Sequence, residues 1–147
     1  MPCIFCQIIN REIPAKIICE NDGALSFLDI HPRSKGHTVI VPKIHAGTIS
    51  ELPPEFDGEL LKTVRETIAR LGNLSPDGFT IGVNHGEFSG QEVPHLHVHI
   101  IPRYKGDGGS SIQSVVSNKP EASVSDVWDS IVKTVGIKQN SNRLIPK

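Results

Sequence analysis

Apolar residues recur every three or four positions in two long segments of the chain, which predicts two main helices. The clearer one covers residues 55–71, and its apolar stripe consists of Phe56, Leu60, Val64, Ile68 and Leu71. The second covers residues 124–135, and its stripe consists of Val124, Val127, Trp128, Ile131, Val132 and Val135. Gly72 and Gly136 follow the two stripes, as glycine often does at the end of a helix. The same spacing predicts a short N-terminal helix at Ile4, Phe5, Ile8 and Ile9.

Short runs of β-branched and apolar residues predict five strands, at residues 16–20, 25–29, 37–41, 79–84 and 95–101. Between the first two strands, Asn21, Asp22 and Gly23 predict a hairpin turn, because Asp-Gly tolerates positive φ. Short strands joined by such turns favour an α+β fold with a central antiparallel sheet. The pattern alone leaves an α/β arrangement open, since the long helix stands between two strands.

The chain is long enough for one domain, and we expect a single domain spanning residues 1–147. Its core should cover about residues 3–105. Residues 106–147 should then form a Gly- and Ser-rich loop, the C-terminal helix and a tail.

Charge and hydrophobicity exclude two classes of partner. Fifteen Lys plus Arg against 16 Asp plus Glu give a net charge of -1, whereas nucleic-acid-binding modules carry a basic excess, so we expect no nucleic acid partner. No apolar run approaches the ~20 residues that span a bilayer, so we expect no membrane partner. The N-terminus lacks the basic and apolar regions of a secretory signal, which predicts a cytoplasmic protein.

Three histidines alternate with apolar residues in the last predicted strand. Successive side chains of a strand face opposite sides, so His95, His97 and His99 should form a row. The opposite, buried face should carry Leu96, Val98 and Ile100. Residues four apart in a strand are ~13 Å apart, too far for the outer two histidines to share one metal ion. The row therefore has at least two tasks.

Histidine suits phosphoryl chemistry, because a neutral imidazole can attack phosphorus and a second histidine can balance charge on the phosphate oxygens. The loop before the strand, residues 84–93, can present amide and backbone N–H groups to an anion. An ordinary polar strand face is the alternative for the row, and an ordinary hairpin connection is the alternative for the loop.

These residues resemble the signature of the histidine triad superfamily, in which three histidines alternate with apolar residues. Other blocks of the chain resemble the same family in the same order, at residues 3–6, 13–15, 27–30, 36–37, 42–45 and 90–93. The resemblance is closest to the branch of nucleoside phosphoramidate and nucleotide hydrolases. It implies the histidine triad fold, a homodimer, and a purine nucleotide as substrate.

The resemblance also implies a role for each matching residue. His97 would attack the α-phosphorus and form a nucleotidyl-histidine, which water then hydrolyses. His99 would contact the α-phosphate, and His37 would support both catalytic histidines. Phosphate contacts would also come from Asn84, Gln91, Glu92 and Val93.

For the nucleoside, the resemblance implies that Asp29 holds the ribose hydroxyls. The base pocket would be lined by Ile4, Phe5, Ile8, Phe27 and Ile30. The alternative for these apolar residues is plain core packing, and for Asp29 it is a turn before His31 and Pro32.

Two positions depart from related enzymes. Phosphoramidases of animals have Ser where this chain has Glu92, near the leaving group, which leaves the rate and the leaving-group preference open. Diadenosine polyphosphate hydrolases usually have Gln where this chain has Asn84, and they lack the pair of cysteines; that activity is the second hypothesis. The competing hypothesis from another functional class is a zinc-stabilised nucleotide-binding or adaptor protein with little turnover.

Cys3 and Cys6 have the spacing of half a zinc site. By resemblance to zinc-binding members of the family, His45 and His95 would complete a structural zinc site. The alternative is a pair of buried thiols on a short helix. Cys19 lies in a predicted strand and should be an inert buried thiol.

Overall fold

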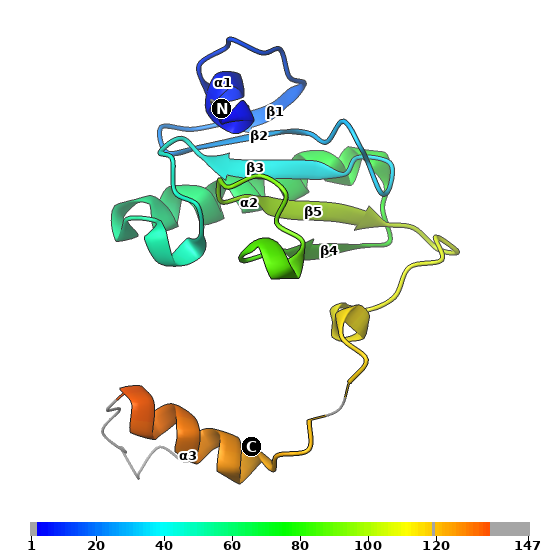
Figure 1. Cartoon of the computed structure of the whole chain (residues 1–147). Coiled ribbons are helices and arrows are strands. Elements are labelled where there is room, and N and C mark those ends of the chain that lie inside the picture. The colour runs from blue at the N-terminus through cyan, green and yellow to red at the C-terminus, as the bar shows by residue number, and fades with distance from the viewer. Residues whose placement is uncertain (1–2, 119, 136–147) are drawn as a thin grey trace. The chain divides into compact units, whose positions relative to one another are not determined.

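The computed structural model describes residues 3–118 and 120–135. Five strands form one antiparallel sheet in the order β1-β2-β3-β5-β4 (Figure 1). The strands are β1 (Ile17–Glu20), β2 (Ala24–Leu28), β3 (Thr38–Pro42), β4 (Gly78–Gly82) and β5 (Val98–Arg103). This sheet confirms the predicted α+β fold and removes the α/β alternative, because every strand pair in it is antiparallel.

The helices are α1 (Ile4–Ile9), α2 (Asp57–Leu71) and α3 (Val124–Val135). Short 3-10 turns lie at Ile49–Glu51, Pro54–Phe56, Gly72–Leu74, Glu87–Ser89 and Ile112–Val115. The predicted helix at 55–71 therefore begins as a 3-10 turn. Pro54 suits this first turn, because the N–H that proline lacks has no partner there in any helix.

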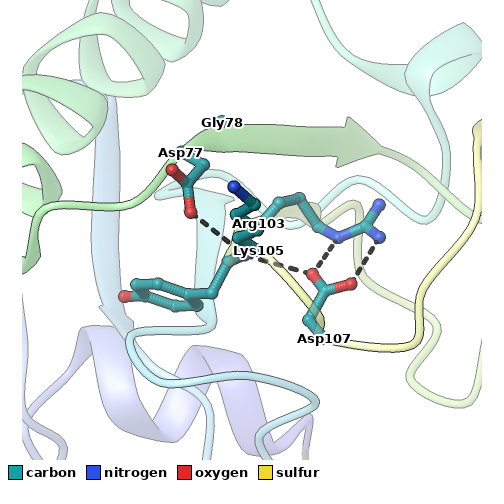
Figure 2. A pocket seen from close by; sticks show the side chains of 6 residues that line it. Asp77, Gly78, Arg103, Lys105 and Asp107 are labelled. Carbon is teal, nitrogen blue, oxygen red and sulfur yellow. Dashed lines mark hydrogen bonds and ion pairs between the residues drawn. The ribbon is translucent and has the colours of Figure 1, made fainter.

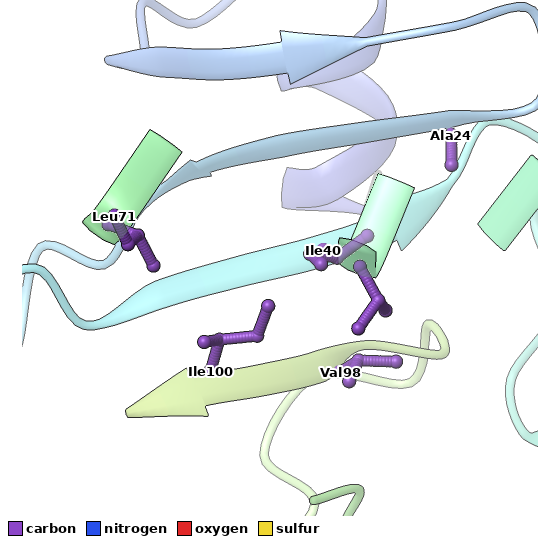
Figure 3. Packing of buried hydrophobic residues seen from close by; sticks show 6 residues of the cluster. Ala24, Ile40, Leu71, Val98 and Ile100 are labelled. Carbon is purple, nitrogen blue, oxygen red and sulfur yellow. The ribbon is translucent and has the colours of Figure 1, made fainter. Parts of the chain in front are cut away.

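Alternation along the strands sends apolar side chains to two separate clusters. On one face, α2 contributes Val64 and Leu71 to a cluster with Ala24, Ile40, Val98 and Ile100 (Figure 3). On the other face, Ile8 of α1 packs with Leu25, Phe27, Val39 and Val41. The sheet therefore has one helix over each face, and β2 and β3 are covered on both sides.

The hairpin between β1 and β2 forms as predicted, but positive φ at Gly23 is not its cause. Within the described residues, positive φ occurs at Arg11, Ser75 and five other glycines. A Cβ on Gly23 would lie 2.7 Å from the Cβ of Glu59. Glycine is required here because α2 passes directly over the turn.

The last strand starts three residues later than predicted, at Val98 instead of His95. The N–H of His95 donates to the carbonyl of Val93, and the N–H of Leu96 donates to the carbonyl of Ala46. Both N–H groups therefore bond to carbonyls outside the neighbouring strands, and the sheet pairing of β5 starts only after them. The histidine row thus begins in the loop and ends in the strand.

The chain divides into two compact units, one ending at Ile112 and one beginning at Gln113. The first unit holds the sheet, α1 and α2. The second holds α3, on which Val124, Val127, Trp128 and Ile131 are exposed. A single domain over 1–147 stays a prediction, and Gly136 and the predicted tail lie outside the described residues. No helix of the described residues is long and apolar enough to cross a membrane.

Candidate functional site

The three histidines lie on the face of the sheet that α1 covers. Leu96, Val98 and Ile100 are buried, as the alternation predicted. His99 pairs with Val39 across β3 and β5, so it shares the face of that residue. The ring centres of His97 and His99 are 5.0 Å apart, and the ring of Phe5 from α1 lies 5.3 Å from that of His97.

Cys3, Cys6, His45 and His95 converge at one end of this row, with their ligand atoms within 4.8 Å of one another. Cys3 directly precedes α1, Cys6 lies in α1, and the histidines follow β3 and precede β5. The Nδ1 of His95 is 3.4 Å from the Sγ of Cys3 and 3.6 Å from the Sγ of Cys6, and the Nδ1 of His45 is 3.3 Å from the Sγ of Cys6. Tetrahedral zinc with ordinary bond lengths separates its sulfur and nitrogen ligands by about 3.6 Å. The four side chains therefore fit a zinc ion.

A backbone carbonyl sets the tautomer of His95. The Nε2–H of this fully buried ring donates to the carbonyl of Pro42 at 2.9 Å. The Nδ1 then has a free lone pair directed at the cysteines, as a metal ligand needs. Burial lowers the pKa of His95, which keeps the ring neutral. Burial and the neighbouring Cys3 thiol raise the pKa of Cys6, so zinc would have to displace a proton from that thiol.

A second backbone carbonyl sets the tautomer of His97. The Nδ1–H of His97 donates to the carbonyl of His95 at 2.7 Å. The Nε2 therefore has the free lone pair that a nucleophilic imidazole requires. Because His95 lies in the cysteine group, the same residue that fits the metal also orients His97.

A chain of hydrogen bonds orients His99. The backbone N–H of Arg33 donates to the Nδ1 of His37, so the proton of neutral His37 is on Nε2. That Nε2–H donates to the Nδ1 of His99 at 3.0 Å. His99 is left with an Nε2–H as a free donor. Burial, together with the nearby His97 and His37, lowers the pKa of His99 to about 4.

Asp29, His37 and His99 form a second group whose ligand atoms lie within 4.8 Å. The hydrogen bonds argue against a metal ion there. The Nδ1 of His37 already accepts from Arg33, so a metal on Nε2 would remove the one ring proton of neutral His37 and leave an imidazolate. This group is therefore a hydrogen-bonded chain.

The loop before β5 is held by the side chain of Gln91. Its Oε1 accepts from the N–H of Gly86, and its Nε2 donates to the carbonyls of Gly47 and Val93. The Nδ2 of Asn84 donates to the carbonyl of Gly90. Gly86 and Gly90 adopt φ of 88° and 92°, which other residues rarely adopt. The predicted phosphate contacts of this loop stay a prediction, and Glu92 on it is exposed.

Of the residues predicted to line the base pocket, some lie in the core and others at the surface. Ile8 and Phe27 are buried in the cluster under α1, as their core-packing alternative predicted. Phe5 is partly buried, and its ring centre is 5.7 Å from that of Phe27. Ile4 is exposed, and Ile30 is 80% exposed. The base pocket itself stays a prediction.

A hollow of about 370 Å³ lies at the far end of β5, lined by Asp77, Gly78, Arg103, Tyr104, Lys105 and Asp107 (Figure 2). Both acidic groups in it have partners: Asp107 forms an ion pair with Arg103, and Asp77 accepts from the N–H of Lys105. None of the triad histidines lines it. It therefore contributes nothing to the chemistry of the row.

Sequence reasoning missed three parts of the site, the N–H of Arg33 and the carbonyls of Pro42 and His95. All three are backbone groups, so the identity of the residue carries no signal for them. Only the fold brings them to His37, His95 and His97.

Comparison with known proteins shows a family match over most of the chain. The family model of the HIT domain matches residues 10–106. A HIT-like protein of Methanocaldococcus jannaschii is 52% identical over 106 residues, which cover 72% of this chain and 82% of that protein. An adenosine 5'-monophosphoramidase of Schizosaccharomyces pombe is 37% identical over 112 residues, which cover 76% of this chain and 82% of that enzyme.

Solved structures share the fold. A member of the HIT family from Bacillus subtilis is 33% identical, with a TM-score of 0.78 over 100% of both chains. A Zn-bound histidine triad family protein from Mycobacterium smegmatis is 38% identical, with a TM-score of 0.67 over 75% of this chain and 81% of that one. Both likenesses agree with the antiparallel sheet described above.

Proposed function

Because the chain belongs to the HIT domain family, we propose that it hydrolyses purine nucleoside phosphoramidates or related nucleotides at the α-phosphate, through a nucleotidyl-histidine intermediate on His97. One observation carries this proposal. The Nδ1–H of His97 is bound to a carbonyl, which leaves its Nε2 bare, and the ring centre of His97 is 5.0 Å from that of His99, whose Nε2–H is a donor. A nucleophile and a donor for the phosphate oxygens therefore stand side by side.

In the first step, the Nε2 of His97 forms a bond to the α-phosphorus and the bond to the leaving group breaks. His99 donates its Nε2–H to a phosphate oxygen, where negative charge increases in the transition state. In the second step, a water oxygen replaces His97 on phosphorus. Over the whole reaction one water is consumed: its oxygen stays on the nucleotide and one proton goes to the leaving amine.

For the rest of the substrate, we propose the contacts that the family implies. Asp29 would bind the ribose hydroxyls, and the base would lie against Ile4, Phe5 and Ile30. The phosphate would meet the loop that carries Asn84, Gln91, Glu92 and Val93. Ile8 and Phe27 would support the pocket from below, since both are buried.

We also propose one structural zinc ion, held by Cys3, Cys6, His45 and His95. The four-ligand group and the Zn-bound relative from Mycobacterium smegmatis support it. The ion would cross-link α1 to the segment before β5 and hold the His95 carbonyl in place. His97 would then keep its orientation, because that carbonyl accepts its Nδ1–H.

A homodimer is proposed on the family resemblance. Light scattering at micromolar concentration should give a particle of twice the 16.0 kDa mass of the chain. A particle of single-chain mass would contradict the dimer.

The nucleophile is tested with His97→Ala. This variant should lose AMP release from an adenosine phosphoramidate by more than the ~10²–10⁴-fold that is typical of a lost acid or base. It should still bind AMP, because the imidazole makes no base or ribose contact in the proposed mode. Lys62→Ala is the control, since Lys62 is exposed on α2, which covers the opposite face of the sheet.

His99→Ala should turn over slowly and leave a detectable adduct. Mass mapping of a quenched reaction with labelled substrate should place the label on His97. A label on another residue, or near-normal turnover by His97→Ala, would refute the assignment. Dinucleoside polyphosphates in the same assay test the alternative substrate class.

A further inference from the structure

The Asp29 carboxylate lies against the hydrogen-bonded chain that ends at His99. Its Oδ1 accepts from the N–H of His31 at 2.8 Å, and its Oδ2 is 3.6 Å from the Nε2 of His37. The side chains of Asp29 and His37 are only 17% and 4% exposed. An ionised group this close to a buried imidazole acts through a medium that screens it weakly.

The Nε2–H of His37 therefore has two acceptors around it. The Nδ1 of His99 is the nearer, at 3.0 Å, and the Oδ2 of Asp29 is the farther. Both require the proton of His37 to be on Nε2. If the proton were on Nδ1, it would meet the N–H of Arg33, and the carboxylate would meet a bare nitrogen lone pair.

Burial and two neighbouring residues oppose the effect of Asp29 on the pKa values of this pair. Burial lowers the pKa of both His37 and His99. Arg33 lowers the pKa of His37 further, and His97 lowers that of His99. Asp29 is the acidic group that opposes them at both histidines. As charge develops on a phosphate oxygen and the Nε2–H of His99 shifts toward it, a carboxylate behind His37 supports the donation.

We propose that Asp29 is a positioning residue that acts through His37 to fix the Nε2–H tautomer of His99, independently of any contact between Asp29 and the nucleotide. The inference rests on the proposed function, because it assigns His99 as the phosphate donor. The positioning role of Asp29 is additional to its proposed contact with the ribose hydroxyls. A carboxylate has about four lone-pair sites, and the bonds described here use one of them fully and a second in part.

The ribose role and the positioning role predict different responses to the substrate. If Asp29 acts only on ribose hydroxyls, its replacement has no effect on a substrate that lacks them. If it acts through His37, the effect on kcat persists. We therefore compare adenosine phosphoramidate with its 2',3'-dideoxy counterpart.

The variant is Asp29→Asn. Its Oδ1 can still accept from His31, while its amide N–H₂ faces the N–H of His37 and offers no acceptor. We expect kcat to fall roughly 10- to 100-fold with both substrates, at or below the lower end of the ~10²–10⁴-fold that a proton-donating group contributes. KM should rise with the ribose substrate alone. Asp77→Asn, which also removes a carboxylate that accepts a backbone N–H, should change neither constant.

Long-range ¹⁵N NMR of the imidazole rings gives a readout apart from activity. In the wild type, His37 and His99 should both appear as Nε2–H tautomers. In Asp29→Asn, the signals of His99 should move toward a mixture of tautomers. An Nδ1–H tautomer of His37 in the wild type would overturn the proposal, whether or not the variant folds.

Unchanged kcat of Asp29→Asn with the dideoxy substrate would also overturn it, and would leave Asp29 as a ribose ligand alone. Failure of the proposed function looks different. In that case the wild type hydrolyses neither substrate, and the tautomers of His37 and His99 alone decide the role of Asp29.

Discussion

At the scale of residues, four neighbouring histidines differ in which ring nitrogen carries the proton, because their hydrogen-bond partners differ. Carbonyl groups bind the Nε2–H of His95 and the Nδ1–H of His97. An N–H binds the Nδ1 of His37, which in turn determines the tautomer of His99. The side chains are chemically identical. Their partners determine which nitrogen is free, and hence what each ring can do.

His99 also gives stability a pH dependence. Its pKa is about 4 in the folded chain and 6.5 in the unfolded chain, so between these pH values the unfolded chain binds more protons. The free energy of unfolding should therefore fall as pH drops from 6.5 to 4, by about 3 kcal/mol at most for this group. Above pH 6.5 the group is neutral in both states and contributes no slope.

Urea unfolding at a series of pH values measures this effect. The free energy of unfolding of His99→Gln should fall less steeply than that of the wild type between pH 6.5 and 4. The difference between the two slopes isolates His99 from His95 and His37, whose pKa values burial also lowers. Parallel slopes would show that His99 titrates in the folded chain as it does in the unfolded one.

At the scale of elements, one side chain ties the first hairpin to α2. The Oδ1 of Asn21 accepts from the N–H groups of Gly23 and Ala24. Its Nδ2 donates to the carbonyl of Glu59 and to the hydroxyl of Thr63. The turn and the helix are thus joined by four hydrogen bonds, at the place where Gly23 permits close contact.

Asn21→Ala removes these four bonds at once and leaves buried partners without a replacement. We expect it to reduce the free energy of unfolding by roughly 2–4 kcal/mol. Asn10→Ala is the control, because the side chain of Asn10 makes an exposed hydrogen bond to Glu12. Its effect should stay within about 0.5 kcal/mol. Equal losses in the two variants would show that burial of the bonds does not matter.

At the scale of the whole molecule, the cysteine and histidine group joins segments that are far apart in the sequence. Cys3 and His95 are separated by 92 residues. A metal ion there closes a long loop and should add to the stability of the sheet. Such an ion would also connect stability to the proposed catalysis, since the carbonyl of His95 accepts the Nδ1–H of His97.

Purified protein should therefore contain about one zinc per chain, as expected for a closed four-ligand site. Chelation should lower the melting temperature and the rate of AMP release together. Cys6→Ser should lose zinc. Cys19→Ser should retain it, because that buried thiol contacts the hydroxyl of Thr67 outside the group. Metal-free protein of unchanged stability would refute a structural zinc.

The sequence by itself determined the main helices and strands, the two faces of the histidine row, and the four side chains that come together at one end of that row. Periodicity reports which side of a strand or helix is buried, and Leu96, Val98 and Ile100 show that it did so here. Spacing also showed that His95 and His99 must have separate tasks, and the structure places them in separate groups.

Only the tertiary structure decided how these parts act. The position of β5 between β3 and β4 brings His99 to His37. The end of β3 brings the carbonyl of Pro42 to His95, and the segment after β3 brings His45 to it. Local patterns cannot specify such pairings, because they depend on contacts between residues distant in sequence. The tautomers likewise depend on the backbone N–H of Arg33 and the backbone carbonyl of Pro42. Every residue type supplies a carbonyl, and every type except proline supplies an N–H. The sequence therefore identified the histidines, and the fold determined which ring nitrogen of each one carries the proton.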